Sequence, residues 1–172
     1  MNKIPFILLT ILSLNNIFSQ SESVTNFKIE ENEILGQKVI KLKNTKEKYI
    51  EQLKLKEFFT NLDRSESSIV GKSNKKDLKI KSPYWSSFPF DCFVKIEFKE
   101  NRFRITFSNI TFDGPEIEVY GVKQKYDYKL SEEGKRKGKL KKSKNILKVF
   151  SELNKFFENI TSENQIEKKS NW

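Results

Sequence analysis

Residues 93–112 read FVKIEFKENRFRITFSNITF, and this stretch decides the fold. Apolar and polar residues alternate along both of its halves, a period of two that turns one face of a strand to a core and the other to water. Glu100 and Asn101 lie where the halves meet and are the predicted turn of a β-hairpin. The apolar residues change parity after Asn109, which predicts a β-bulge or the end of pairing there. The stretch therefore predicts a half-buried antiparallel sheet.

Three further elements follow from similar patterns. Residues 34–43 predict the first strand, and residues 46–62 predict a helix that is capped by Thr45. The apolar residues of this helix fall on two different sides, so either the helix is buried over a broad face or it breaks near Lys54. Residues 145–160 carry apolar residues at spacings of three and four, which predicts an amphipathic closing helix with Ser143 as its N-cap.

Shorter strands complete the predicted sheet. Residues 68–71 and 77–81 predict a strand that is interrupted by a charged turn, and residues 116–120 predict another, with Ile117 and Val119 facing the core. Helices with one apolar face pack well on a sheet with one apolar face. The predicted fold class is α+β, a two-layer fold in which two helices pack on one face of an antiparallel β-sheet, in the order β-α-β-β-β-β-α.

The amino terminus is typical of a secretory signal peptide. Lys3 precedes an apolar run over residues 4–14, and small or polar residues follow it. An uncleaved anchor or a buried helix is the alternative. The run is not followed by a cysteine for lipid attachment, so we expect a periplasmic or secreted protein. The expected organisation is a signal peptide over 1–20, a single domain over 21–162 and a polar tail over 163–172.

The composition argues against most catalytic and metal sites. The chain contains no histidine and one cysteine, Cys92, which lies on the apolar parity of its strand and is expected to be buried. Histidine is the commonest general base and metal ligand, so we expect no enzyme activity, no cofactor and no metal. Glu116 and Glu118 share a face, as paired catalytic carboxylates can, but nearby arginines would keep both ionised. The alternative function is a carboxylate-dependent hydrolase acting at the aromatic loop 84–90.

Two basic segments are candidate contacts for an anionic partner. Residues 135–144 carry seven positive charges, in a polar segment 122–144 that Gly134 and Gly138 are expected to make flexible, and the whole chain has a net charge of +10. Such a polycation attracts phosphates, anionic lipid head groups or acidic polysaccharide by charge alone; the alternative is a solvated loop. The second segment is the polar face of the 93–112 hairpin, where cross-strand ion pairing with acidic residues is the alternative explanation. The candidate contacts are Lys135, Arg136, Lys137, Lys139, Lys141, Lys142, Lys144, Arg102 and Arg104.

Aromatic residues crowd into the loop before the hairpin. Tyr84, Trp85 and Phe88 lie within five residues of one another in the segment 82–89. They are a candidate aromatic groove for a ligand. Alternatively, this loop folds back over an open edge of the core.

Three features together resemble a known family. They are the strand with Val39-Ile40 before a lysine-rich helix, the stretch VKIEFKENRFRITFSNI from Val94 to Ile110, and Phe156-Phe157 in the closing helix. Over residues 32–160 the chain resembles the DUF4468 family of exported Bacteroidetes proteins, a domain of unknown function with a TBP-like fold. The resemblance implies an exported α+β domain and assigns no site residue. TBP-like describes the fold and does not imply DNA binding.

The expected function is therefore a non-enzymatic exported domain that serves as a binding or accessory module of the bacterial envelope. Its expected partner is an unknown protein or an envelope polyanion. We expect no sequence-specific binding of nucleic acid, at most peripheral contact with a membrane, and a monomeric state.

Overall fold

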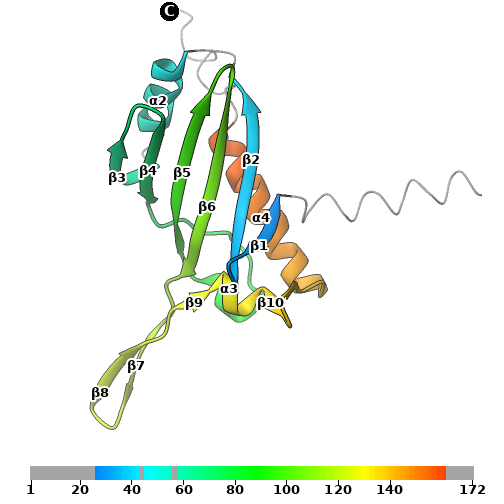
Figure 1. Ribbon diagram of the computed structural model, residues 1–172. Coiled ribbons are helices and arrows are strands. Elements are labelled where there is room, and N and C mark those ends of the chain that lie inside the picture. The colour runs from blue at the N-terminus through cyan, green and yellow to red at the C-terminus, as the bar shows by residue number, and fades with distance from the viewer. Residues whose placement is uncertain (1–25, 43–44, 56–57, 162–172) are drawn as a thin grey trace, which may run out of the picture.

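The computed structural model of the chain describes residues 26–42, 45–55 and 58–161. The predicted signal peptide and the whole of the predicted tail lie outside these ranges. A seven-stranded antiparallel sheet with the strand order β1-β2-β6-β5-β4-β3 forms one layer, and β9 pairs with the end of β6 (Figure 1). Its strands are β1 (Phe27–Glu30), β2 (Glu33–Lys41), β3 (Phe59–Arg64), β4 (Ser68–Ser73), β5 (Phe90–Lys99), β6 (Arg102–Phe112) and β9 (Tyr128–Lys129).

Two helices, α2 (Lys46–Leu55) and α4 (Lys144–Thr161), pack on the same face of this sheet. Tyr49 of α2 packs on Phe103 with ring centroids 4.3 Å apart, and Phe157 of α4 stacks on Phe107 at 3.6 Å. Gly36 of β2 permits this close approach, because a Cβ there would lie 2.8 Å from the Phe157 ring. The predicted two-layer α+β class is confirmed. Within the described ranges, no helix is both long enough and apolar enough to cross a bilayer.

The hairpin β5–β6 has the predicted form. Glu100 and Asn101 connect the strands beyond the pair Lys99 and Arg102, and the inner face of both strands is buried in alternation. The predicted bulge is confirmed as well, because the register shifts opposite Asn109, whose φ angle is 46°. A bulge moves the following residues to the other face, which keeps Ile110 and Phe112 in the core.

The first helix is shorter than the helix predicted over residues 46–62, and it breaks as the second of the two alternatives expected. Thr45 caps it as predicted, since the Lys48 N–H donates to Thr45 Oγ1 at 3.4 Å. The helix ends at Leu55, and the predicted extension to residue 62 is wrong. Residues 59–64 instead form β3, which pairs with β4 as an edge strand. The break lies close to Lys54: Tyr49 and Ile50 pack in the core from α2, whereas Phe59 and Leu62 pack against it from β3.

The prediction of a strand over 77–81 is wrong, although the one over 68–71 is confirmed by β4. Residues 77–81 form an irregular connection, in which the φ angle of Lys79 is 55°. It buries Leu78 and Ile80 and follows a single bridge from Lys76 to Phe90. Strand β1 was not predicted, because the first strand expected from the sequence begins at residue 34. The φ angles of Glu31 and Asn32 are 48° and 70°, values that suit the two-residue turn between β1 and β2.

Residues 116–125 leave the sheet altogether. Strands β7 (Glu116–Val119) and β8 (Val122–Lys125) pair only with each other and form a two-stranded ribbon that projects from the domain (Figure 1). The predicted inward orientation of Ile117 and Val119 is therefore wrong: each is 45% exposed. The place beside the end of β6 is taken by β9, so β7 has no sheet to join.

The prediction of a flexible loop over 122–144 is also wrong. This segment contains β8, β9, α3 (Leu130–Glu133), β10 (Lys135–Arg136) and β11 (Lys139–Leu140). Its few apolar residues hold it in place, because Leu130 is fully buried and Leu140 packs against the core. Gly134 is buried too, between Leu130 and Ile34. The closing helix α4 then begins directly after Ser143, close to the predicted start.

Candidate functional site

The basic hairpin, residues 135–144, is an ordered surface element. Strands β10 and β11 pair with each other, and the turn residues Lys137 and Gly138 have φ angles of 51° and 71°. Both angles belong to the left-handed region that tight turns of β-hairpins need. The cations of this segment therefore project from a folded turn.

The base of the basic hairpin is fastened to the rest of the domain. Lys135 Nζ donates to the backbone and side-chain oxygens of Asn32, in the turn between β1 and β2. The Lys141 N–H donates to the Gly134 carbonyl at 2.8 Å, and the Leu140 side chain packs against the core. These contacts fix where the cations stand relative to the sheet.

The charge of the basic hairpin is not compensated within the described part of the chain. Its seven cations form no ion pair with a described carboxylate. Two nearby acids have other partners: Glu132 pairs with Lys129 at 3.6 Å, and Glu33 accepts the Asn109 N–H. Like charges this close repel one another and attract anions.

Five of these cations surround an open depression of about 750 Å³ between the β10–β11 turn and the start of α4. Leu140 is the apolar residue of its lining. The others are polar or basic: Arg136, Lys137, Lys139, Lys141, Lys142 and Ser143. A wide depression with cationic walls suits an extended anionic chain or a layer of anionic groups better than a small enclosed ligand.

Arg102 and Arg104 do not join this surface. They lie at the start of β6, whereas the basic hairpin adjoins the elements at its far end (Figure 1). A strand of 11 residues spans about 35 Å. The two groups of cations predicted from the sequence are therefore separate surfaces at opposite ends of the sheet.

Cross-strand ion pairing, the alternative given in the sequence analysis, accounts for some of the basic residues on the outer face of the sheet. Glu97 binds Arg104 Nη2 at 2.8 Å and Lys95 Nζ at 3.2 Å. Burial raises the pKa of Glu97, but the hydrogen bonds and charges of Arg104 and Lys95 outweigh it and hold the pKa below its usual value. Glu116 and Glu118 take no part, because they lie on the projecting ribbon.

Arg102 stands in a row of cations that ion pairing does not explain. In the register of the sheet it lies directly opposite Lys41 of β2 on one side and Lys99 of β5 on the other. No ion pair joins any of the three to a described carboxylate. Directly opposed like charges destabilise a sheet. Arg102 and Lys99 also line a groove of about 460 Å³, which makes this row a second candidate for anion binding.

Sequence reasoning missed Lys41 because the strand that neighbours β6 could not be known in advance. Residues 34–43 show that Lys41 belongs to a strand, but they do not show its register. The alternation of the predicted strand was the available signal. Once β2 is aligned with β6, that alternation places Lys41 on the outer face beside Arg102.

The aromatic loop divides its three candidate residues between core and surface. Trp85, in the short 3-10 helix Tyr84–Ser87, is buried against Phe112 with ring centroids 4.9 Å apart. Phe88 stacks on Tyr128 at 6.0 Å and packs edge-on with Tyr84 at 5.0 Å. Tyr84 itself is 64% exposed. The loop thus folds over the end of the core while one ring faces solvent.

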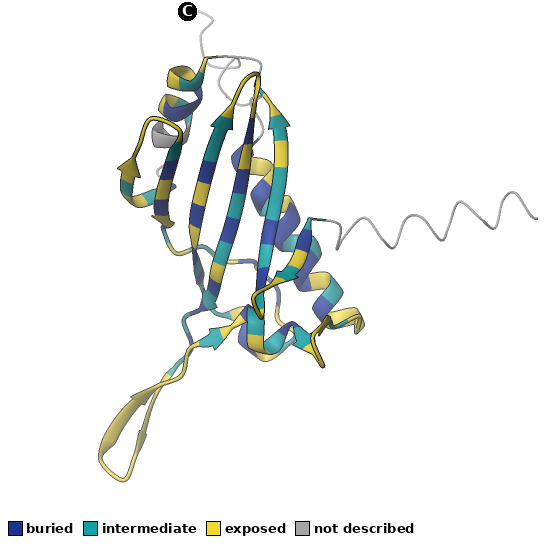
Figure 2. Cartoon of the chain, in the orientation of Figure 1, coloured by how far each residue is buried: buried dark blue, intermediate teal, exposed yellow. Residues whose placement is uncertain are grey.

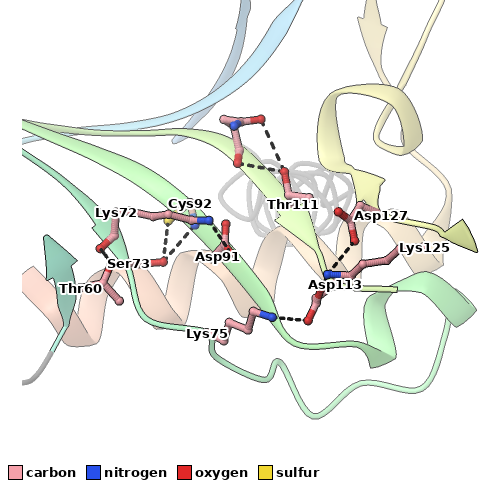
Figure 3. Close-up of polar contacts among 11 residues, drawn as sticks. Thr60, Lys72, Ser73, Lys75, Asp91, Cys92, Thr111, Asp113, Lys125 and Asp127 are labelled. Atoms are coloured by element: carbon pink, nitrogen blue, oxygen red, sulfur yellow. Dashed lines mark hydrogen bonds and ion pairs between the residues drawn. The ribbon is translucent and has the colours of Figure 1, made fainter. Parts of the chain in front are cut away.

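The ribbon is exposed along its whole length (Figure 2). Its base is held firmly, as Figure 3 shows, by Asp113, which forms ion pairs with both Lys75 and Lys125. Hydrogen bonds from these two lysines lower the pKa of Asp113 below its usual value. Gly114 permits a close approach of the two backbone segments at this base, because a Cβ there would collide with the Tyr126 carbonyl oxygen.

The structure gives no chemistry to Cys92. Its side chain is fully buried, and its N–H donates to Ser73 Oγ at 3.0 Å. Burial raises the pKa of the Cys92 thiol to about 12, although the hydrogen bond with Ser73 acts in the opposite direction. A thiol of this kind is unreactive, since the thiolate is the nucleophile. Within the described residues, no three acidic or thiol side chains gather as metal ligands.

The sequence matches no protein-family model and no curated protein. Two solved structures are similar to the chain. A TBP-like protein from Parabacteroides distasonis gives a TM-score of 0.50 at 12% identity, over 77% of this chain and 93% of that one. A DUF4468 family protein from Bacteroides ovatus gives a TM-score of 0.49 at 14% identity, over 80% of this chain and 86% of that one.

Identities this low speak for the fold and leave activity open. The similarity to the Parabacteroides protein covers most of both chains, and it agrees with a sheet that carries α2 and α4 on one face. The resemblance expected from the sequence is confirmed at this level: the chain is a two-layer α+β domain with the TBP-like fold.

Proposed function

We propose that this chain is an exported, non-enzymatic binding module that holds an anionic partner of the cell envelope through its basic hairpin. The observation that carries the proposal is the uncompensated charge of residues 135–144, seven cations without an acidic partner among the described residues, on a hairpin fastened at its base. Such a surface binds anions by long-range attraction and needs no catalytic group.

The amino-terminal segment supports the location. An apolar run after Lys3 and the polar residues that follow it are typical of export. Outside the cytoplasm, the available polyanions are acidic polysaccharides and the phosphate-bearing surfaces of lipids. The open depression beside the basic hairpin supports contacts with many anionic groups at once, each of them weak.

Retention of the purified protein on immobilised heparin, measured against salt concentration, tests this proposal. In the test variant, four exposed cations of the basic hairpin become glutamine: Arg136, Lys137, Lys139 and Lys142. In the matched control, four exposed lysines of other elements become glutamine: Lys48, Lys81, Lys148 and Lys155. Each variant loses four of the ten net charges and therefore has a net charge of +6.

We expect the wild type to be retained and the test variant to elute at much lower salt, with the control near the wild type. Salt should weaken retention throughout, because surface charges are screened over about 8–10 Å at physiological ionic strength. Equal losses in the two variants would mean that net charge alone matters. No loss in the test variant would refute a role for the basic hairpin.

A further inference from the structure

We propose that the anionic partner is the surface of a lipid bilayer, and that the ribbon β7–β8 inserts its apolar tip among the head groups. This inference rests on the proposed function and names the partner of the basic hairpin. It depends on a different part of the molecule, the ribbon. Attraction of anions to the basic hairpin gives no role to the exposed apolar residues of this ribbon.

The ribbon is amphipathic across its two faces. Its register pairs Ile117 with Gln124 and Val119 with Val122, which puts all three apolar residues on one face. The opposite face carries charged residues only: Glu116, Glu118, Lys123 and Lys125. Ile117 and Val119 are each 45% exposed and Val122 is 67% exposed. Neighbouring apolar residues that are exposed on one face of a two-stranded ribbon are typical of a surface that a partner or a membrane covers.

The end of the ribbon is its most apolar part. The tip reads Val119-Tyr120-Gly121-Val122, and Tyr120 and Gly121 form the turn with φ angles of 52° and 80°. Tyr120 is completely exposed. A tyrosine with an apolar ring and a polar hydroxyl is the kind of side chain that settles at the boundary between lipid head groups and acyl chains.

The dimensions of the ribbon fit this role. Each of its strands has four residues, so the tip extends about 13 Å beyond the base. Amphipathic elements at a membrane surface bury their apolar side about 5–10 Å deep. Insertion of the tip would therefore bring the base of the ribbon to the lipid surface without burying the folded domain. The ion pairs that Asp113 forms with Lys75 and Lys125 hold that base to the domain.

The basic hairpin lies at the same end of the domain as the ribbon (Figure 1). The ribbon leaves from the end of β6, and β9, which pairs with that same end, leads through α3 into β10. Cations there would stand near the head groups once the tip is inserted. Each lysine or arginine close to an anionic membrane raises binding about fivefold, and this attraction reaches about one Debye length.

Charge complementarity and size favour a bilayer over a protein partner. The basic hairpin complements an anionic surface, and the ribbon itself is neutral, with two glutamates and two lysines. A stable protein interface uses about 20–30 residues a side, far more than the few apolar residues of this tip. Peripheral membrane binding, by contrast, works when two weak signals act together, one apolar and one basic.

Binding to sedimented vesicles is the first measurement. The vesicles contain phosphatidylcholine mixed with phosphatidylglycerol, or phosphatidylcholine alone. The tip variant carries Tyr120→Ser and Val122→Ser, and the control carries Val70→Ser, an exposed valine on the outer face of β4. We expect the wild type and the control to bind the anionic vesicles, the tip variant to bind at least tenfold more weakly, and all three to keep the same retention on heparin.

Insertion is measured directly with an environment-sensitive fluorophore attached to a Tyr120→Cys variant. The label cannot react with Cys92, which is fully buried. The control label sits on a Glu100→Cys variant, in the exposed turn at the opposite end of the sheet. We expect anionic vesicles to shift the emission to shorter wavelength at position 120 and to leave it unchanged at position 100.

The outcomes separate the two proposals. If the wild type binds heparin but not vesicles, or if the tip variant binds vesicles as well as the wild type does, the bilayer inference is wrong and the proposed function stands. If the wild type binds neither, the proposed function is wrong. If the wild type is a dimer in solution without lipid and the tip variant is a monomer, the ribbon covers a second copy, and the bilayer inference is again wrong.

Discussion

The hairpins β5–β6 and β7–β8 share the same alternation of apolar and polar residues, but the first packs under helices and the second projects into solvent. Both place apolar residues on one face and charged residues on the other. The apolar face of β5–β6 is covered by α2 and α4, with Ile105 fully buried. The apolar face of β7–β8 is exposed, and Ile117 lies in solvent. The pattern thus specifies a strand with two unlike faces, whereas the neighbouring elements decide whether the apolar face meets a core.

The largest expected difference between the two hairpins comes from making the same substitution, isoleucine to alanine, in each of them. Ile105→Ala should lower the free energy of unfolding by about 2–5 kcal/mol, because it leaves a cavity in a packed core. Ile117→Ala should change it by less than about 0.5 kcal/mol, because no core contact is lost. Urea unfolding followed by circular dichroism measures both values. A large loss for Ile117→Ala would show that the ribbon is covered in the free protein.

Gly114, between the two hairpins, tests whether the junction is part of the folded core. Gly114→Ala should lower the free energy of unfolding by about 1–3 kcal/mol, because the added methyl group collides with backbone that cannot move freely. Gly121→Ala is the control, since its Cβ would meet no atom within 4 Å. The φ angle of Gly121 is 80°, so Gly121→Ala strains the turn of the ribbon alone, and the loss should be smaller than at Gly114. Equal losses at both positions would contradict this picture.

The buried thiol gives the β5–β6 hairpin a signature in alkaline solution. The Cys92 pKa is raised to about 12 in the folded protein, so the unfolded chain loses its thiol proton first as the pH rises above about 9. The resulting loss of stability is absent below that pH and grows toward pH 12. Relative to Cys92→Ala, the wild type should lose about 1 kcal/mol more between about pH 8 and about pH 10.

Other groups that titrate in this range, such as lysines and tyrosines, are shared by the wild type and Cys92→Ala, so the difference between their unfolding curves isolates the thiol. Parallel pH profiles for the two proteins would mean that water reaches Cys92 in the folded state.

The smallest effect concerns the charged faces of the two hairpins. Glu97→Gln should lower the free energy of unfolding by about 0.2–1 kcal/mol at low salt, and by less at high salt, because the ion pairs with Arg104 and Lys95 are partly exposed. Glu118→Gln should have no effect, since Glu118 has no ion-pair partner among the described residues. A salt-independent loss for Glu97→Gln would point to packing instead of charge.

Local patterns predicted most of the sheet and both large helices. The alternation from Phe93 to Phe112, its turn and its bulge were readable because each depends on neighbours in sequence. The closing helix was readable for the same reason. What failed were assignments that depend on distant segments. Ile117 and Val119 face solvent because β9 occupies the place beside β6, and the sequence near these two residues gives no sign of that pairing.

The candidate site was predicted in part. The seven cations of residues 135–144 were visible as composition, but their presentation on a hairpin depends on Leu130, Gly134 and Asn32, which lie in other elements. The separation of Arg102 from those cations follows from the direction of β6, and this is a property of the sheet. The exposed ribbon could not be predicted, because its alternation is the same as that of a buried strand.

The free edge of β2 bears on how this protein behaves at high concentration. Strand β1 pairs with β2 only as far as Gly36, and beyond it β2 pairs with β6 alone among the described strands. Unpaired strand edges invite other chains to extend the sheet, the first step toward aggregation. Here the open segment ends at Lys41, which forms no ion pair with a described carboxylate, so two such edges brought together would place like charges near each other. Strand β2 thereby disfavours the edge-to-edge association of two sheets.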